Sequence, residues 1–206
     1  MRNKEKSTNI YFVRHGQTDY PLDRIYCDGV EDPALNQNGM FQAKLAALYL
    51  RDKDLSAIYS SPALRTQTTA SEISQVTGLD IQTEKDWIER RFGIWEGLYF
   101  HEIEEQYPEE YLNWKKDKVS YTPDNGETIE DVGQRLGVSL KNLIENHSGE
   151  NIAVVSHVGP IRIAVCLAMD IPLRNYRQIR IDYASVSRID YGQTLNNLIN
   201  LNYCGY

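Results

Sequence analysis

Cysteine is scarce in this chain, and no two cysteines have the spacing of a metal site. Cys27, Cys166 and Cys204 are scattered and odd in number, which argues against a disulfide framework and against a zinc site. Such usage is typical of a reducing compartment. No apolar run approaches membrane-spanning length, and the polar start, MRNKEKSTN, is followed by an apolar run far too short for a signal peptide. These absences predict a cytoplasmic protein with no membrane partner.

An excess of positive charge is also missing. The 206 residues include 22 Lys and Arg against 29 Asp and Glu, a formal net charge of −7. This balance argues against nucleic acid as a partner, and a negatively charged substrate would need a local positive pocket. With 41% hydrophobic and 25% charged residues, the length suits a single α/β domain over residues 1–206.

Short apolar runs alternate with amphipathic stretches along the chain. The pattern predicts strands at about 9–13, 55–59, 80–84, 152–155, 184–190 and 195–201, and helices at about 37–51, 62–77, 127–147 and 160–169. This alternation predicts a three-layer α/β/α fold with a mainly parallel, doubly wound sheet. Residues 98–125 are polar, aromatic and interrupted by proline, and are predicted to form a helical insertion near the active site.

Several helix boundaries have their own signals. Asn36 is a candidate N-cap, and Thr128 with Asp131 has the spacing of a capping box. Ser60-Ser61-Pro62 suggests a capped helix with proline at its first position, and Gly78 is a natural stop for that helix.

Two of the predicted strands end in the same way. NIYFVRHG, residues 9–16, and NIAVVSHVG, residues 151–159, are apolar runs that end in histidine, with glycine within two residues. Ligands of parallel sheets bind outside the carboxyl ends of the strands. If these strands are neighbours, His15 and His157 meet at that edge. His101 and His147 lie in polar helical contexts and are expected to be ordinary surface residues.

The segment SSPALR, residues 60–65, also follows a strand and opens a helix. Free N–H groups and the helix dipole favour an anion at such a start, and Arg65 in the first turn can add a forked contact to phosphate or carboxylate oxygens. Taken alone, the segment fits a capped helix with a solvated arginine better.

These segments together resemble a known family. RHGQT at 14–18, SSPALRT at 60–66, IERRFGIWEG at 88–97 and SHVG at 156–159 are similar, in this order, to the motifs of the histidine phosphatase superfamily, in its small, phosphoglycerate mutase-like phosphatase branch. The similar region covers residues 9 to about 170. The resemblance implies a phosphoglycerate mutase-like fold and a phosphomonoester hydrolase without metal or cofactor. It also implies a small phosphorylated metabolite as substrate.

The resemblance also implies roles for single residues. His15 would be the nucleophile that becomes a transient phosphohistidine, with His157 beside it. Glu89 matches the general acid that protonates the leaving alcohol. Glu96 is the nearest competing carboxylate.

The phosphate pocket of the family is matched by Arg14 and Arg65, with Gln17 and Thr18 as further polar candidates. One departure concerns the loop after the first motif. Many members carry asparagine six residues beyond the nucleophile, where this chain has Pro21. One phosphate donor is therefore lost, and the loop is stiffened instead.

Two other functions stay open at this point. One is phosphoglycerate mutase-type phosphotransfer, favoured by Lys115, Lys116 and Lys118. The acidic residues of the insertion count against it because they would repel a bisphosphorylated intermediate; they are Glu102, Glu104, Glu105, Glu109 and Glu110. The other is a non-catalytic phospho-ligand binder, which the Pro21 departure suggests.

The aromatic residues near the expected pocket also allow two interpretations. These residues are Tyr20, Tyr26, Tyr99, Tyr107, Tyr111 and Trp114. They either line the mouth of the pocket or pack the insertion onto the domain. Sugar phosphates, phosphoglycerates, nucleotide-like phosphates and phosphoserine remain candidate substrates. A homodimer through an edge strand remains open.

Overall fold

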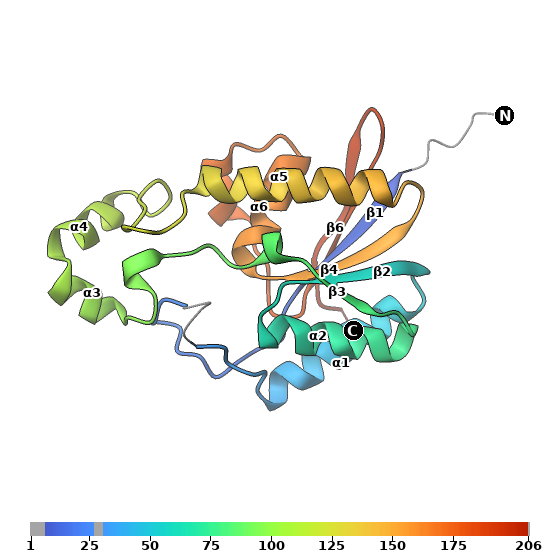
Figure 1. Ribbon diagram of the computed structural model, residues 1–206, viewed down its shortest axis with the longest axis horizontal. Helices are drawn as coiled ribbons and strands as arrows, with labels where there is room; N and C mark the ends of the chain where they lie inside the picture. Colours follow the sequence, from blue (N-terminus) through green and yellow to red (C-terminus); the bar gives the residue numbers. More distant parts are fainter. Residues whose placement is uncertain (1–6, 27–30, 206) are drawn as a thin grey trace.

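A six-stranded sheet organises the protein (Figure 1). The computed structural model describes residues 7–26 and 31–205, so residues 1–6 and Cys27, used above, lie outside the described residues. The strands are β1 (Thr8–Arg14), β2 (Leu55–Ser60), β3 (Ile81–Thr83), β4 (Asn151–Ser156), β5 (Val186–Tyr191) and β6 (Asn196–Tyr203), in the order β3-β2-β4-β1-β5-β6. The first four strands of this order are parallel, and β5 and β6 run antiparallel to their neighbours. The predicted mainly parallel sheet is confirmed.

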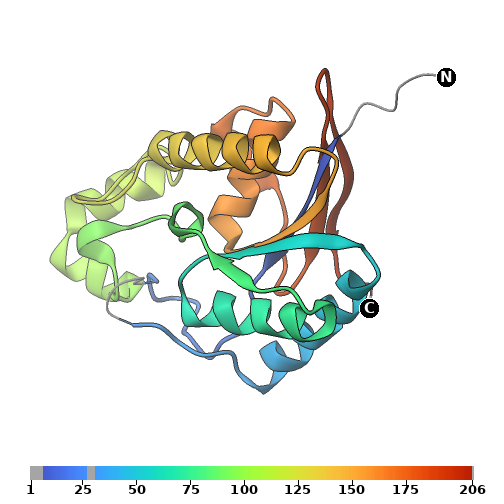
Figure 2. The same cartoon turned by 45° about the vertical axis from the view of Figure 1, so that its right-hand side comes forward.

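Helices cover both faces of the sheet (Figure 2). Helices α1 (Gln37–Arg51) and α2 (Leu64–Thr77) lie on one face, and α5 (Ile129–Asn146) and α6 (Val158–Ala168) on the other. Strand β1 is buried on both sides because its side chains alternate between the two faces. Tyr11 and Val13 pack into the core beneath α1 and α2, whereas Ile10 and Phe12 pack into the core beneath α5 and α6. The predicted three-layer α/β/α architecture is therefore present.

A third, aromatic core lies at one end of the molecule, around α3 (Phe100–Gln106) and α4 (Pro108–Lys116). Its buried members are Ile25, Trp95, Ile103 and Tyr111, and Tyr107, Trp114 and Tyr121 pack against them. The stretch 98–125 thus contains the expected helices. The described residues also form three short 3₁₀ helices: Lys85–Trp87, Gly93–Trp95 and Leu173–Gln178.

The predicted helix boundaries lie within two residues of the observed ones. The Asn36 side chain accepts from the Gly39 N–H at 2.8 Å, and Thr128 and Asp131 form the capping box. Helix α2, however, begins at Leu64 rather than at Pro62, and Ser60 and Ser61 do not cap it. Helix α6 begins at Val158, two residues before the predicted start. No helix among the described residues is both long and apolar enough to cross a membrane.

The true cap of α2 comes from far away in the sequence. The carboxylate of Asp32 accepts from the Leu64 N–H, at 2.9 and 2.8 Å from its two oxygens. The helix N-terminus therefore already holds a carboxylate of the protein. The Leu64 N–H is therefore occupied, and the expectation that the rest of this N-terminus binds a substrate anion stays a prediction.

Candidate active site

The two histidines that end neighbouring strands lie side by side. In the β1–β4 register, Arg14 is paired with Ser156, and the His15 N–H donates to the Ser156 carbonyl at 3.0 Å. The ring centroids of His15 and His157 are 5.3 Å apart. The predicted meeting of the two strand ends is confirmed.

Glycine is required after His15 because the chain crosses the start of α1 there. A Cβ at Gly16 would lie 2.4 Å from the Gly39 carbonyl oxygen, and a Cβ at Gly39 would lie 2.0 Å from the Gln17 carbonyl oxygen. The Gly16 N–H donates to Thr69 Oγ1 at 3.1 Å. The turn that carries His15 is therefore fixed to both α1 and α2.

The hydrogen bond of His15 determines its tautomer. Its Nδ1 lies 2.8 Å from the Gly16 carbonyl oxygen. A carbonyl can only accept, so Nδ1 carries the proton and Nε2 keeps its lone pair. Burial lowers the pKa of His15 well below its ordinary value, and the charges of Arg65 and Arg14 act in the same direction. His15 is thus a neutral imidazole whose Nε2 is unprotonated.

His157 is held from both of its ring nitrogens. Its Nδ1 accepts from Arg65 Nη2 at 2.8 Å, and its Nε2 lies 2.9 Å from Ser61 Oγ. Burial lowers the pKa of His157 well below its ordinary value, as do Arg65, His15 and Arg14. Since Nδ1 accepts, the proton of the neutral ring is on Nε2 and is donated to Ser61. Sequence reasoning assigned Ser61 to the cap of α2 and missed this contact.

The two predicted phosphate-binding arginines are both present at this edge. The guanidinium of Arg14 lies 3.8 Å from the ring centroid of Tyr183, and its Nη1 donates to the Ile181 carbonyl at 2.9 Å. Burial lowers the pKa of Arg14, although Tyr183 and Glu89 oppose this shift. Arg65 is 2% exposed and stacks on Tyr26 at 3.6 Å. No sequence signal pointed to Tyr183.

Glu89 reaches the same edge from the segment that follows β3. Its carboxylate accepts from the Arg90 N–H at 2.8 Å and from the Gly159 N–H at 3.3 Å. A Cβ at Gly159 would lie only 2.2 Å from Glu89 Oε1, so the glycine after His157 leaves room for this carboxylate. The competing carboxylate of Glu96 is instead bonded to the Phe92 N–H at 2.8 Å.

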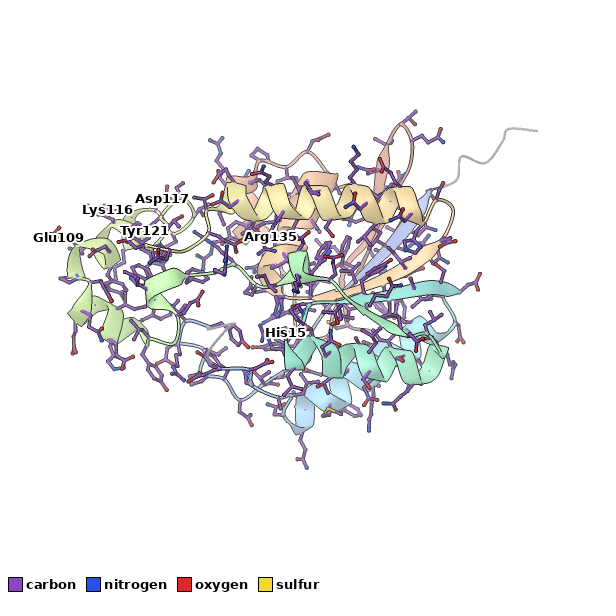
Figure 3. All side chains as sticks on the ribbon, in the orientation of Figure 1. His15, Glu109, Lys116, Asp117, Tyr121 and Arg135 are labelled. Atoms are coloured by element: carbon purple, nitrogen blue, oxygen red, sulfur yellow. The ribbon has the colours of Figure 1, made fainter. Side chains whose placement is uncertain are left out.

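A buried ion pair holds the backbone that carries Glu89. Arg135 of α5 donates to the carbonyl oxygens of Ile88 at 3.0 Å and of Glu89 at 3.3 Å (Figure 3). Glu127 accepts from Arg135 Nε at 2.9 Å and from the Arg91 N–H at 3.0 Å. Burial alone would raise the pKa of Glu127, but these hydrogen bonds lower it. Neither role was found from the sequence.

These side chains surround a cavity of about 260 Å³, called the phosphate pocket here. Its lining consists of Arg14, His15, Thr18, Tyr20, Pro21, Leu22, Arg24, Tyr26, Arg65, Glu89, His157, Val158 and Tyr183. Among the described residues of this lining, Glu89 is the only carboxylate. The predicted local positive pocket therefore exists within an acidic protein.

Gln17 is not brought to the phosphate pocket. Its side-chain oxygen accepts from Asn38 at 2.6 Å, and its N–H donates to Gln42 at 3.0 Å. The residue therefore connects the turn to α1 and is not among the residues that line the phosphate pocket. Thr18, by contrast, lines the pocket, as does Pro21.

The predicted aromatic residues divide into two groups. Tyr20 and Tyr26 line the phosphate pocket, while Tyr107, Tyr111 and Trp114 belong to the aromatic core. Tyr99 lies against the guanidinium of Arg24, with its ring centroid 5.3 Å away. The packing interpretation is therefore correct for the residues of α4.

The three lysines that kept a mutase open have partners of their own. Lys115 forms an ion pair with Glu104 at 3.4 Å, Lys116 donates to Asn113 at 3.4 Å, and Lys118 lies 4.8 Å from the ring centroid of Trp114. Figure 3 shows Lys116 at the far end of the molecule from His15. None of the three is among the residues that line the phosphate pocket.

The remaining histidines lie elsewhere. His101 is exposed, and His147 Nδ1 pairs with Glu150 at 2.7 Å. Within residues 7–26 and 31–205, no group of three or more His, Cys, Asp or Glu is arranged to hold a metal ion.

Comparison with known proteins identifies relatives of this chain. It is 35% identical over 201 residues to the bifunctional protein Rv2228c of Mycobacterium tuberculosis, covering 97% of this chain but 55% of that relative. The chain thus spans about half the length of these mycobacterial relatives. It is 32% identical over 194 residues to phosphoserine phosphatase 1 of Hydrogenobacter thermophilus, covering 94% of this chain and 91% of that protein. It is 30% identical over 189 residues to "Probable phosphoglycerate mutase GpmB" of Yersinia pestis, covering 90% and 86%.

A solved structure shares the fold. The α-ribazole phosphatase of Shigella flexneri superposes with a TM-score of 0.86 at 27% identity, covering 95% of this chain and 96% of that one. The family model of the histidine phosphatase superfamily (branch 1) matches residues 10–203. That match spans nearly the whole chain and includes both histidine-ended strands. The protein belongs to the histidine phosphatase superfamily.

Proposed function

We propose that the protein is a phosphomonoesterase that acts through a transient phosphohistidine on His15. One observation carries this proposal more than any other. The His15 Nδ1–H is committed to the Gly16 carbonyl, and burial between Arg14 and Arg65 lowers the pKa of the ring. Nε2 is therefore the unprotonated nitrogen at neutral pH, and His15 lines a pocket together with Arg14, Arg24 and Arg65.

In the first step, the Nε2 lone pair attacks phosphorus and forms the P–N bond. The P–O bond to the leaving alcohol breaks, its electron pair stays on the oxygen, and that oxygen takes a proton from the Glu89 carboxyl group. The Nδ1–H of His15 remains on the Gly16 carbonyl throughout, so the phosphorylated ring keeps its orientation. Arg14 and Arg65 offset the negative charge of the phosphoryl oxygens.

In the second step, water attacks the phosphohistidine and gives up a proton to Glu89. The P–N bond breaks, its electron pair returns to Nε2, and inorganic phosphate leaves. The net reaction consumes one phosphomonoester and one water and releases an alcohol and phosphate. Both proton transfers use one carboxyl group, which therefore acts first as an acid and then as a base.

The place of Glu89 supports its assignment as the general acid. A second cavity of about 190 Å³ adjoins the phosphate pocket, and the two share Tyr26, Glu89 and Val158 in their linings. Glu89 thus stands where a phosphoryl group in one cavity would meet a leaving group in the other. A general acid needs this position, within hydrogen-bond reach of the bond that breaks.

Hydrolysis is favoured over a mutase reaction by the position of Lys115, Lys116 and Lys118, none of which lines the phosphate pocket. A mutase must retain a bisphosphorylated intermediate, and the lysines suited to that task are occupied within the α3–α4 region. A mere phospho-ligand binder, in turn, would need neither a nucleophile nor an acid. We infer a small phosphorylated metabolite as substrate, since relatives are named for phosphoserine and α-ribazole phosphates.

The test is phosphate release from a panel of phosphomonoesters in the presence of a metal chelator, with His15→Ala beside the wild type. The panel includes p-nitrophenyl phosphate and 3-phosphoglycerate, the latter with and without 2,3-bisphosphoglycerate. Release that survives chelation and disappears in His15→Ala is the expected result. Formation of 2-phosphoglycerate without net phosphate would make the protein a mutase, and binding without any turnover would make it a binder.

Glu89→Gln tests the acid separately. Alkyl phosphates have poor leaving groups and depend on protonation, whereas p-nitrophenolate leaves without it. The variant should therefore lose at least about 100-fold in kcat/KM, which reports the first step, on alkyl phosphates and far less on p-nitrophenyl phosphate. An equal loss on both kinds of ester would refute Glu89 as the acid.

A further inference from the structure

The second cavity, on the far side of Glu89, has an unusual balance of charge; it is called the side pocket here. Its lining contains three arginines, Arg90, Arg162 and Arg177, and among the described residues a single carboxylate, that of Glu89. The chain as a whole carries a net charge of −7. Positive charge has therefore been concentrated beside the catalytic pocket, where a leaving group would lie.

The three arginines differ in what their guanidinium groups already bind. Arg90 is buried and committed: its Nε donates to the Glu127 carbonyl at 2.8 Å and its Nη2 to the Tyr121 carbonyl at 2.9 Å. Arg162 uses only its Nε, on the Ile179 carbonyl at 2.6 Å. Among the described residues, the two Nη groups of Arg162 have no hydrogen-bond partner and the side chain forms no ion pair.

Arg162 is also half-buried and close to a like charge. Burial lowers the pKa of Arg162, and Arg177 acts in the same direction, while Tyr176 and Glu89 oppose the shift. Arg177 is exposed and has one hydrogen bond, from Nη1 to the Lys118 carbonyl at 3.3 Å. Two guanidinium groups that repel each other, with no acidic partner among the residues described, are stabilised when an anion binds between them.

We propose that the side pocket binds a carboxylate on the leaving group of the substrate, through the two free Nη groups of Arg162 with Arg177 beside them. This inference rests on the proposed function and specifies its substrate class: phosphomonoesters of hydroxy acids. A carboxylate matches the planar fork of Arg162, because two parallel N–H donors on one guanidinium meet its two oxygens. Tyr176 and Phe92 supply apolar walls for the carbon chain between carboxylate and phosphate.

A matched pair of esters tests the proposal. 3-Phosphoglycerate is compared with the glycerol phosphate of the same configuration, in which a hydroxymethyl group replaces the carboxylate. The wild type should prefer the acid by about 10- to 100-fold in kcat/KM, the range of a charge-assisted hydrogen bond. Arg162→Gln should reduce this ratio to near one. A bisphosphate in the panel shows whether a phosphate serves as well as a carboxylate, and equal preference for it would overturn the assignment to hydroxy acids.

Two more variants keep the test decisive. Arg177→Gln changes an exposed side chain and should lower the ratio by a few-fold. Arg174→Gln is the matched control, since Arg174 is exposed on the same 3₁₀ turn but does not line the side pocket. It should leave the ratio and the activity unchanged. If Arg162→Gln does not fold, two results still test the proposal. One is the preference of the wild type for the acid over the glycerol phosphate. The other is a lower preference in Arg177→Gln but not in Arg174→Gln.

Failure of this inference can be told from failure of the proposed function. Turnover that requires His15, with a ratio near one for the two esters, would refute the side pocket and leave the phosphatase intact. An acid preference that persists in Arg162→Gln would also refute it. Calorimetric binding of both esters to His15→Ala needs no turnover. If His15→Ala binds 3-phosphoglycerate more tightly than the glycerol phosphate, and the double variant with Arg162→Gln does not, the carboxylate site is supported even if no ester is hydrolysed.

Discussion

The two buried histidines give the protein a pH dependence of stability whose sign follows from the structure. Burial, with Arg65 and Arg14 nearby, lowers the pKa of both His15 and His157 well below 6.5 in the folded state. In the unfolded chain both rings titrate at their ordinary value. Below about pH 6.5 the unfolded state therefore binds more protons than the folded state, and the free energy of unfolding falls as the pH falls.

The size of the effect follows from linkage. A histidine that stays neutral in the folded state and titrates near 6.5 in the unfolded state lowers the free energy of unfolding by about 1.4 kcal/mol between pH 7.5 and 5.5. Two such histidines together account for roughly 2.7 kcal/mol over this interval. A domain is typically stable by only about 5–15 kcal/mol, so the loss is measurable.

The assay is urea unfolding at pH 7.5 and pH 5.5, on the wild type and on His15→Asn. The buffers must be free of phosphate, because a ligand that binds the folded state would raise its stability. Between pH 7.5 and 5.5 the free energy of unfolding should fall by about 1.4 kcal/mol more in the wild type than in His15→Asn. Contributions of other groups cancel in this difference. An equal loss in both proteins would show that His15 is not held neutral, and the argument for a ready nucleophile would fail with it.

Three further changes test the support of the site. Replacing the ion pair by Arg135→Met with Glu127→Gln should lower kcat/KM on alkyl phosphates at least about 10-fold more than on p-nitrophenyl phosphate, because it loosens the backbone of Glu89. An equal loss in kcat/KM on both esters would contradict this. Gly159→Ala, whose Cβ would lie 2.2 Å from Glu89 Oε1, should show the same selective loss, whereas Gly137→Ala, with nothing within 4 Å, should not. Gly39→Ala should destabilise the fold by about 2 kcal/mol or more, seen as a lower melting temperature, since its Cβ would meet the Gln17 carbonyl at 2.0 Å.

The sheet and the meeting of the two histidines could be predicted from the sequence because each rests on a local pattern. Strands β1 and β4 are continuous apolar runs, which is how parallel strands buried on both faces read in a sequence. Each run ends in histidine, and parallel neighbours place such ends together. The order of the family motifs then added His15, Glu89 and His157 as one set.

What the sequence could not show are contacts between distant segments. The cap of α2 comes from Asp32, 32 residues before Leu64, so the local Ser-Ser-Pro signal was misleading. Arg135 acts on the Ile88 carbonyl, 47 residues away, and nothing in its helical surroundings indicates this. Gln17 follows His15 in the motif, but the turn aims its side chain at Asn38. A motif specifies which residues are near one another in sequence, and only packing decides which of them face the substrate.

The arginines around Glu89 show how one side-chain type can either hold the site or bind in it. Arg135 and Arg90 donate hydrogen bonds to backbone carbonyls, and these bonds hold the segment around Glu89 in place. Arg14 is different, because its Nε is buried without a partner among the described residues. A buried donor of this kind is unfavourable in the absence of a ligand and becomes satisfied when an oxygen of the substrate reaches it. Arg162 differs in that its two Nη groups, which have no partner among the described residues, are not buried. The unsatisfied donors therefore mark where two anionic groups of one substrate would bind, the phosphoryl group at Arg14 and the carboxylate at Arg162.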